Sequence, residues 1–169
     1  MHDTTAKEIG LKSYEYNSVK PHFQFKINDW TILPFELEHD VTNLGYLIQH
    51  GEDKLIYITD TYYSKYSFKG LTGMLLECNY CKDTLDANVA SGEIDLSMKN
   101  RLLKSHLSLE NAKKFLQAND LNKCTNIVLI HLSDRNSNAD RIQREVQELT
   151  QVDTVIADKG MEFELGCGF

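Results

Sequence analysis

The chain has 169 residues, and its 18 Lys and Arg against 25 Asp and Glu give a net charge of −7 with His neutral. That length suits one domain or part of a larger one, and the acidic balance disfavours a broad nucleic-acid-binding surface. No apolar run approaches the roughly 20 residues of a membrane helix, and the N-terminus lacks the apolar core of a secretory leader, so we expect a cytoplasmic protein without a membrane partner.

The first half of the chain is predicted to form strands joined by short turns. Apolar residues alternate with polar ones or form short continuous runs, and Asn28-Asp29 and the loop at Gly51 separate them as in hairpins. Pro34 indicates an edge, a bulge or a break, because proline cannot donate a hydrogen bond to a neighbouring strand. The predicted strands span residues 23–27, 30–38, 45–50, 54–60 and 73–78.

The second half alternates helices with strands. Apolar residues recur every three or four positions in three segments, and Ser108 is a suitable N-cap for the second of them. The predicted helices span residues 94–104, 109–118 and 138–149, and the predicted strands span 126–131, 152–157 and 161–165. Hairpins followed by an α-β-α-β order predict an α/β fold with a mixed β-sheet and helices layered on it.

Three residues that can bind metal follow predicted strands. His39, Asp60 and His131 each lie at the C-terminal end of a strand, where the next loop can direct a side chain into a shared cleft. Imidazole and carboxylate suit zinc, manganese or iron. The spacing alone forms no motif. On spacing alone, a capping aspartate and two surface or hydrogen-bonded histidines are the simpler explanation.

Five segments, taken in sequence order, help to decide between a metal site and a purely structural role. They are PFELEHDVTNLGYLI, KLIYITDTYY, GMLLECNY, SHLSLENAKKFL and NIVLIHLSDRN. Over roughly residues 20–165 the chain resembles the metallo-β-lactamase fold hydrolases, most closely ribonuclease Z-like enzymes and small phosphodiesterases. The resemblance implies a divalent metal cofactor, zinc first, with manganese and iron as alternatives. It implies that His39 binds one metal, that Asp60 bridges two metals and that His131 binds the second. His106 resembles a ribonuclease Z histidine that helps the leaving group depart.

The H-x-H-x-D-H motif of that family, which supplies most of the metal ligands, is absent upstream of the matching region. The chain therefore resembles the C-terminal half of an αββα sandwich. We expect residues 1–169 to form a single partial domain in which residues 1–20 are peripheral. Because missing strands leave a sheet face or edge bare, we expect a homodimer or docking with a separate N-terminal half.

Two functions of different classes follow from these observations. The first is a metal-dependent hydrolase of the phosphodiesterase or nuclease type, which acts on a phosphoester or nucleotide with Asp60 and His106 at its catalytic centre. It needs the missing half for full activity. The second is a non-catalytic binding or assembly protein that keeps the fold.

Other roles remain open for three further residues, Cys78, Cys81 and Glu77. The two cysteines form a C-x-x-C pair that could bind zinc or act in redox chemistry, but no second pair lies at suitable spacing, which favours reduced and partly buried thiols. Glu77 could orient side chains of the site or make a hydrogen bond at a strand end.

Overall fold

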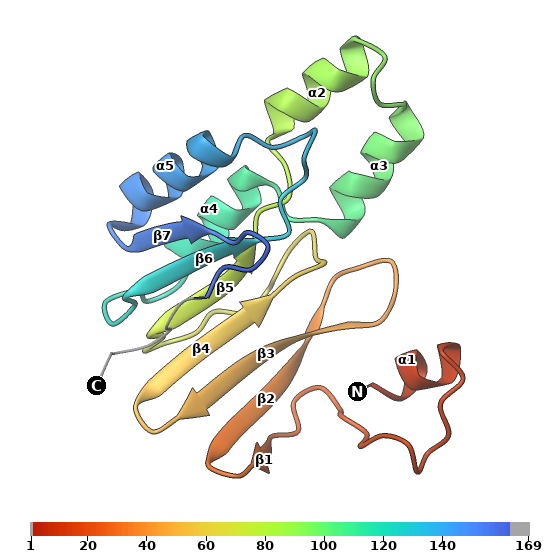
Figure 1. Ribbon diagram of the computed structural model, residues 1–169, viewed down its shortest axis with the longest axis vertical. Helices are drawn as coiled ribbons and strands as arrows, with labels where there is room; N and C mark the ends of the chain where they lie inside the picture. Colours follow the sequence, from red (N-terminus) through yellow and green to blue (C-terminus); the bar gives the residue numbers. More distant parts are fainter. Residues whose placement is uncertain (1, 163–169) are drawn as a thin grey trace.

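Seven strands lie side by side in one mixed sheet, in the same order as in the sequence (Figure 1). Strands β1 to β4 are antiparallel, whereas β4 to β7 are parallel. The structure, a computed structural model, describes residues 2–162. The strands are β1 (Phe25–Ile27), β2 (Trp30–Leu37), β3 (Asn43–His50), β4 (Asp53–Ile58), β5 (Gly73–Glu77), β6 (Asn126–Ile130) and β7 (Asp153–Ile156).

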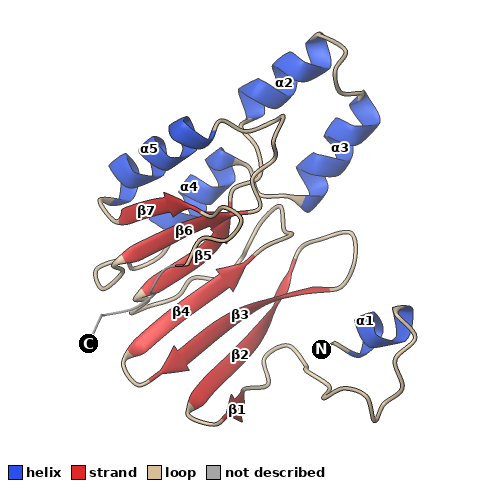
Figure 2. Cartoon of the chain, in the orientation of Figure 1, coloured by secondary structure: helices blue, strands red, loops and turns tan. Residues whose placement is uncertain are grey.

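The helices lie mainly in the crossovers that connect the parallel strands, because parallel neighbours cannot be joined by a tight turn (Figure 2). Helices α2, α3 and α4 connect β5 to β6, and α5 connects β6 to β7. The helices are α1 (Asp3–Glu8), α2 (Lys82–Ala90), α3 (Leu96–Ser105), α4 (Leu109–Gln117) and α5 (Ala139–Thr150). None of the described helices has both the length and the apolar character needed to cross a membrane.

The predicted α/β architecture with a mixed sheet is confirmed, and each predicted element with a counterpart begins and ends within two residues of it. Helix α2 is not predicted from the sequence, because it buries only Leu85 and therefore has no apolar stripe. The strand predicted at 161–165 is not seen at residues 161–162, and its remaining residues lie outside the described part of the chain.

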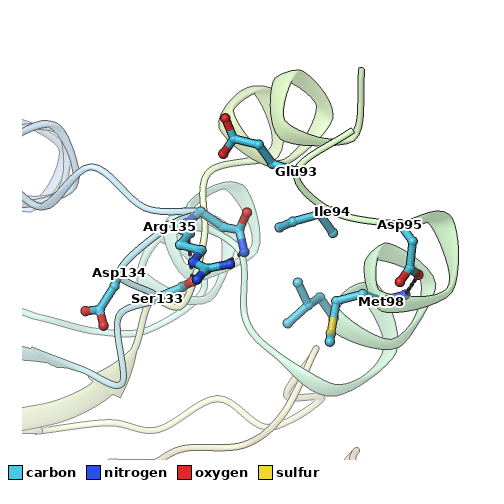
Figure 3. A pocket seen from close by; sticks show the side chains of 9 residues that line it. Glu93, Ile94, Asp95, Met98, Ser133, Asp134 and Arg135 are labelled. Atoms are coloured by element: carbon cyan, nitrogen blue, oxygen red, sulfur yellow. Dashed lines mark hydrogen bonds between the residues drawn. The ribbon is translucent and has the colours of Figure 1, made fainter. Parts of the chain in front are cut away.

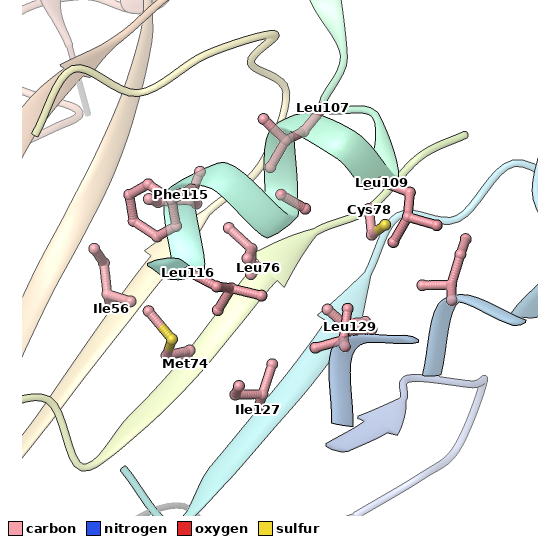
Figure 4. Close-up of a cluster of buried hydrophobic side chains, with 14 of the residues drawn as sticks. Ile56, Met74, Leu76, Cys78, Leu107, Leu109, Phe115, Leu116, Ile127 and Leu129 are labelled. Carbon is pink, nitrogen blue, oxygen red and sulfur yellow. The ribbon is translucent and has the colours of Figure 1, made fainter. Parts of the chain in front are cut away.

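A continuous apolar core lies between one face of the sheet and the helices α4 and α5 (Figure 4). Leu76 of β5 and Ile127 and Leu129 of β6 have no solvent-accessible surface, and Leu116 of α4 packs over them. Each such side chain contributes about 1.5–3 kcal/mol through its removal from water. The packing fixes the parallel strands next to one another, so their carboxyl ends lie along one edge of the sheet.

The other sheet face also carries apolar residues, because side chains alternate between the two faces of a strand. Ile48 pairs with Leu55 across β3 and β4, and Leu75 and Val155 lie on the same side of β5 and β7. All four are only partly buried, and within residues 2–162 no helix packs over them (Figure 1). We call Ile48, Leu55, Leu75 and Val155 the open face.

Candidate metal centre

Polar side chains gather just beyond the carboxyl ends of β4, β5 and β6. Asp60 follows β4 by two residues, Glu77 is the last residue of β5, and His131 directly follows β6. Because these strands are adjacent and parallel, residues far apart in the sequence meet at one sheet edge. Asp60 and His131 have φ angles of 53° and 58°. This left-handed conformation, which Asp and His tolerate better than most residues, turns the chain sharply after each strand.

Glu77 is the buried centre of this group. Its side chain has no solvent exposure, and Oε1 lies 2.7 Å from Nδ1 of His106 and 2.9 Å from Nδ1 of His131. The backbone N–H of Thr61 donates to Oε2 at 3.1 Å. An ionised carboxylate only accepts hydrogen bonds, so each Nδ1 carries a proton. In a neutral imidazole the lone pair then lies on Nε2, which is the usual arrangement when a carboxylate supports a metal-binding histidine.

His106 reaches the cluster from the segment between α3 and α4. Its backbone is extended after the last turn of α3. The backbone N–H of Asn79 donates to the carbonyl of Leu107 at 2.8 Å, and Tyr80 forms a parallel bridge with Ser108. These contacts hold residues 106–108 beside the chain that leaves β5, and so they place His106 above Glu77.

The hydrogen bonds also set the charge of the cluster. Burial raises the pKa of Glu77, but hydrogen bonds from His106, His131 and Thr61 outweigh that effect and hold the pKa below its usual value. The hydrogen bond with Glu77 raises the pKa of His131, with burial acting against it. Glu77 is therefore ionised at neutral pH, and its negative charge favours a cation nearby.

Asp60 adds a second carboxylate on the more accessible side. Its side chain is 38% exposed, and Oδ1 lies 3.3 Å from Nδ1 of His131 and 3.6 Å from Nδ1 of His106. One potential ligand atom from each of Asp60, Glu77, His106 and His131 lies within 4.8 Å of the others. The donor set of imidazoles and carboxylates thus fits a divalent metal.

His39 lies beside this cluster rather than in it. Its Nδ1 is 2.9 Å from the carbonyl oxygen of Ser105, and its Nε2 is 3.1 Å from Oδ1 of Asp40. Its ring centroid is 5.6 Å from that of His106. The structure therefore brings Asp60, His106 and His131 together with Glu77 and puts His39 next to His106. A role for His39 as a metal ligand stays a prediction.

The four residues of the cluster differ in how well the sequence predicts their role. Asp60, His106 and His131 stand in recognisable segments, whereas the sequence leaves the role of Glu77 undecided. Its one local signal is an acidic residue that ends the apolar run GMLLE. A charge buried at such a position requires hydrogen-bonding partners, but the sequence does not tell which residues provide them.

The C-x-x-C cysteines lie apart from the cluster as buried thiols. Cys78 and Cys81 are both free and inaccessible to solvent. Burial raises the pKa of both thiols, that of Cys78 most strongly. Protonated thiols are poor metal ligands and poor nucleophiles, which favours the interpretation as reduced, buried side chains. Cys167 lies outside the described residues.

No protein-family model and no curated protein sequence matches the chain. Solved structures do match. The metallo-β-lactamase fold protein YhfI from Bacillus subtilis has a TM-score of 0.66 at 17% identity, over 94% of this chain and 60% of its own. Zn²⁺-bound PqqB from Methylobacterium extorquens has a TM-score of 0.63 at 13% identity, over 88% of this chain and 55% of its own. The short form of human tRNase Z has a TM-score of 0.51 at 14% identity, over 85% of this chain and 46% of its own.

These matches confirm that the chain has the metallo-β-lactamase fold, as its sequence resemblance predicts. At such low identities they show the fold alone. The chain spans 60% and 55% of the lengths of YhfI and PqqB. The division into one partial domain with a peripheral segment at residues 1–20 stays a prediction.

The role of Glu77 can be tested by replacing it with an amide of the same shape. Glu77→Gln removes the negative charge of the carboxylate that accepts hydrogen bonds from both imidazoles. We expect this change to lower the free energy of unfolding by about 1.5–3 kcal/mol. It should also let His106 and His131 exchange between tautomers, which nitrogen NMR of the imidazole rings measures. Glu148→Gln on the exposed side of α5 is the matched control. Equal stabilities of the two variants, with unchanged Nδ1–H signals, would contradict the assignment.

Proposed function

We propose that this chain is a metal-dependent hydrolase of the phosphodiesterase or nuclease type. The observation that carries the proposal is the convergence of Asp60, Glu77, His106 and His131 at the carboxyl ends of adjacent parallel strands. The similar structures include a Zn²⁺-bound PqqB and a tRNase Z, which supports a metal and a phosphoester or nucleotide substrate for this chain.

In this proposal Asp60 and His131 hold a divalent metal, with zinc first and manganese or iron as alternatives. Asp60 has two carboxylate oxygens and could bridge to a second metal, for which His39 is the other predicted ligand. A bound divalent metal lowers the pKa of water and offsets charge on phosphoryl oxygens. Glu77 orients His131 through Nδ1, because that hydrogen bond fixes both the ring position and the tautomer.

His106 is suited to handling a proton beside the metal ligands. Its side chain is 18% exposed, and its Nδ1–H donates to Glu77 while Oδ1 of Asp60 lies 3.6 Å away. In this proposal His106 passes a proton from Nε2 to the departing oxygen of an ester, while its Nδ1–H stays hydrogen-bonded to Glu77. Removing a well-placed general acid typically costs about 100- to 10,000-fold in rate.

The metal proposal predicts different effects for three histidine or aspartate variants. Asp60→Asn and His131→Ala should weaken zinc binding, measured by competition with a chelating dye, by at least about 10- to 100-fold. Both should abolish hydrolysis of bis(4-nitrophenyl) phosphate. His106→Ala should slow hydrolysis of an alkyl phosphodiester more than of the nitrophenyl ester, because nitrophenolate leaves without a proton.

His50→Ala is the control, since His50 stacks on Trp30 at the opposite end of the sheet. Zinc affinity that is the same in Asp60→Asn, His131→Ala and His50→Ala would refute the metal centre. Zinc binding without hydrolysis, in the presence or absence of a second polypeptide, would refute the enzyme and leave a binding protein.

We also propose that a separate polypeptide bearing the H-x-H-x-D-H motif docks on the open face. Ile48, Leu55, Leu75 and Val155 are partly exposed apolar residues on this face, although Val128, between Leu75 and Val155, is buried. Leu75 lies two residues before Glu77 on the same side of β5. A partner on this surface would therefore end beside the metal centre and could add the missing ligands. The extra length of YhfI and PqqB beyond the match is consistent with such a second half.

Docking can be tested by mixing the chain with an N-terminal half that carries H-x-H-x-D-H, followed by light scattering and metal analysis. We expect a one-to-one complex that binds more zinc than either part. Leu55→Asp together with Leu75→Asp should prevent it, whereas Leu96→Asp on the exposed part of α3 should not. A homodimer that excludes the added half, or a complex unaffected by the Leu55 and Leu75 changes, would overturn this proposal.

A further inference from the structure

A cavity lies between α3 and the loop that follows β6 (Figure 3). Its volume is about 420 Å³, which is within the range of small-molecule sites. Ile94, Met98 and Leu102 form an apolar wall on the α3 side. Ser133, Arg135 and Asn136 form a polar wall from the loop. We call this cavity the α3 pocket.

Asn88 of α2 holds the two walls of the α3 pocket in place. Its carbonyl accepts from the backbone N–H of Glu93 at 2.9 Å and of Ile94 at 3.2 Å. Its side-chain amide donates to the carbonyl of Arg135 and to Oδ1 of Asn136, both at 2.9 Å. Because a single residue binds both walls through four hydrogen bonds, the pocket is formed before any ligand enters.

The pocket is joined to the metal centre by both walls. Leu102 precedes His106 by four residues, which is about 6 Å of helix rise. On the other wall, the N–H of Ser133 donates to the carbonyl of Asn79 at 2.8 Å, and the Asn79 side chain donates to the carbonyl of His131 at 2.7 Å. Both walls of the α3 pocket are therefore held beside the segments that carry His106 and His131.

The side chains of the pocket favour a flat ring with hydrogen-bond acceptors. Figure 3 shows Arg135 across the cavity from Ile94 and Met98. Within residues 2–162 the Arg135 guanidinium has no ion-pair partner, so its donors are available. A guanidinium binds two neighbouring acceptors at once, and a methionine thioether packs well against an aromatic ring.

Charge at the rim favours a neutral ring over an anionic one. The carboxylates of Glu93 and Asp134 lie at the edge of the pocket and point away from its centre (Figure 3). That of Asp95 caps α3 by accepting from the N–H of Met98 at 2.8 Å. Three negative groups around one arginine repel an anionic ring. The acceptors should therefore belong to an uncharged heterocycle.

We propose that the α3 pocket binds a guanine-type base of a nucleotide, whose phosphate lies toward the metal centre. This inference rests on the proposed function, and it specifies which part of a phosphoester the protein recognises. Guanine presents the O6 and N7 acceptors side by side, which a guanidinium binds in a bidentate manner. The ring faces would lie against Met98 and Leu102.

The test is a titration of the protein, both with zinc and in a chelator, with guanosine 5′-monophosphate and adenosine 5′-monophosphate, followed by amide NMR. Both carry the same phosphate, so their difference reports on the base. We expect signals of residues 94–102 and 133–136 to shift, with a preference for the guanine nucleotide of about 10-fold. Arg135→Ala should lower the affinity for the guanine nucleotide by about 10-fold and remove the preference over the adenine nucleotide.

Arg144→Ala, an exposed arginine on α5, is the matched control and should leave both affinities unchanged. Equal affinity for the two nucleotides, shifts outside the pocket, or equal effects of the two arginine variants would overturn the proposal. Repeating the titration with His131→Ala separates it from the proposed function, because base binding in the pocket does not need the metal ligand. Persistence of the guanine preference there supports the pocket even if the metal proposal fails.

Discussion

The Glu77 carboxylate has no contact with solvent, and its charge must therefore be met by hydrogen bonds from the protein. Three donors do this: Nδ1 of His106, Nδ1 of His131 and the N–H of Thr61. The same contacts fix the tautomer of both imidazoles and connect three segments far apart in the sequence. The arrangement of the candidate metal centre depends on this one buried group.

The sheet puts Glu77 where those donors can reach it. Parallel pairing of β4, β5 and β6 lines up their carboxyl ends, and the core beneath α4 and α5 keeps them in register. Left-handed residues at Asp60 and His131 then turn the chain across the sheet edge. Packing energy on one face of the sheet thus supports the polar geometry at its end. The opposite face has apolar residues but no covering helix within the described chain.

Much of the fold could be predicted because its signals are local. Apolar runs marked the strands, and the helical spacing of Leu109, Ala112 and Leu116 marked α4. Helix α2 has no such spacing, so its presence depends on its contacts rather than on its pattern. Asp60 and His131 could be predicted as site residues because each is a polar residue within two positions of the end of an apolar strand. The hydrogen-bonding partners of Glu77 could not be predicted, because they come from segments 29 and 54 residues away.

Zinc titration of the metal-free protein, followed through the imidazole nitrogen signals, tests the central claim most directly. If the cluster at the ends of β4, β5 and β6 binds the metal, the Nε2 signal of His131 should change first, with its Nδ1–H retained by Glu77. The signals of His22, in the turn before β1, and of His50, at the end of β3, should stay constant because neither residue belongs to the cluster. Changes at His22 or His50 with an unaffected His131 would contradict the metal centre described above.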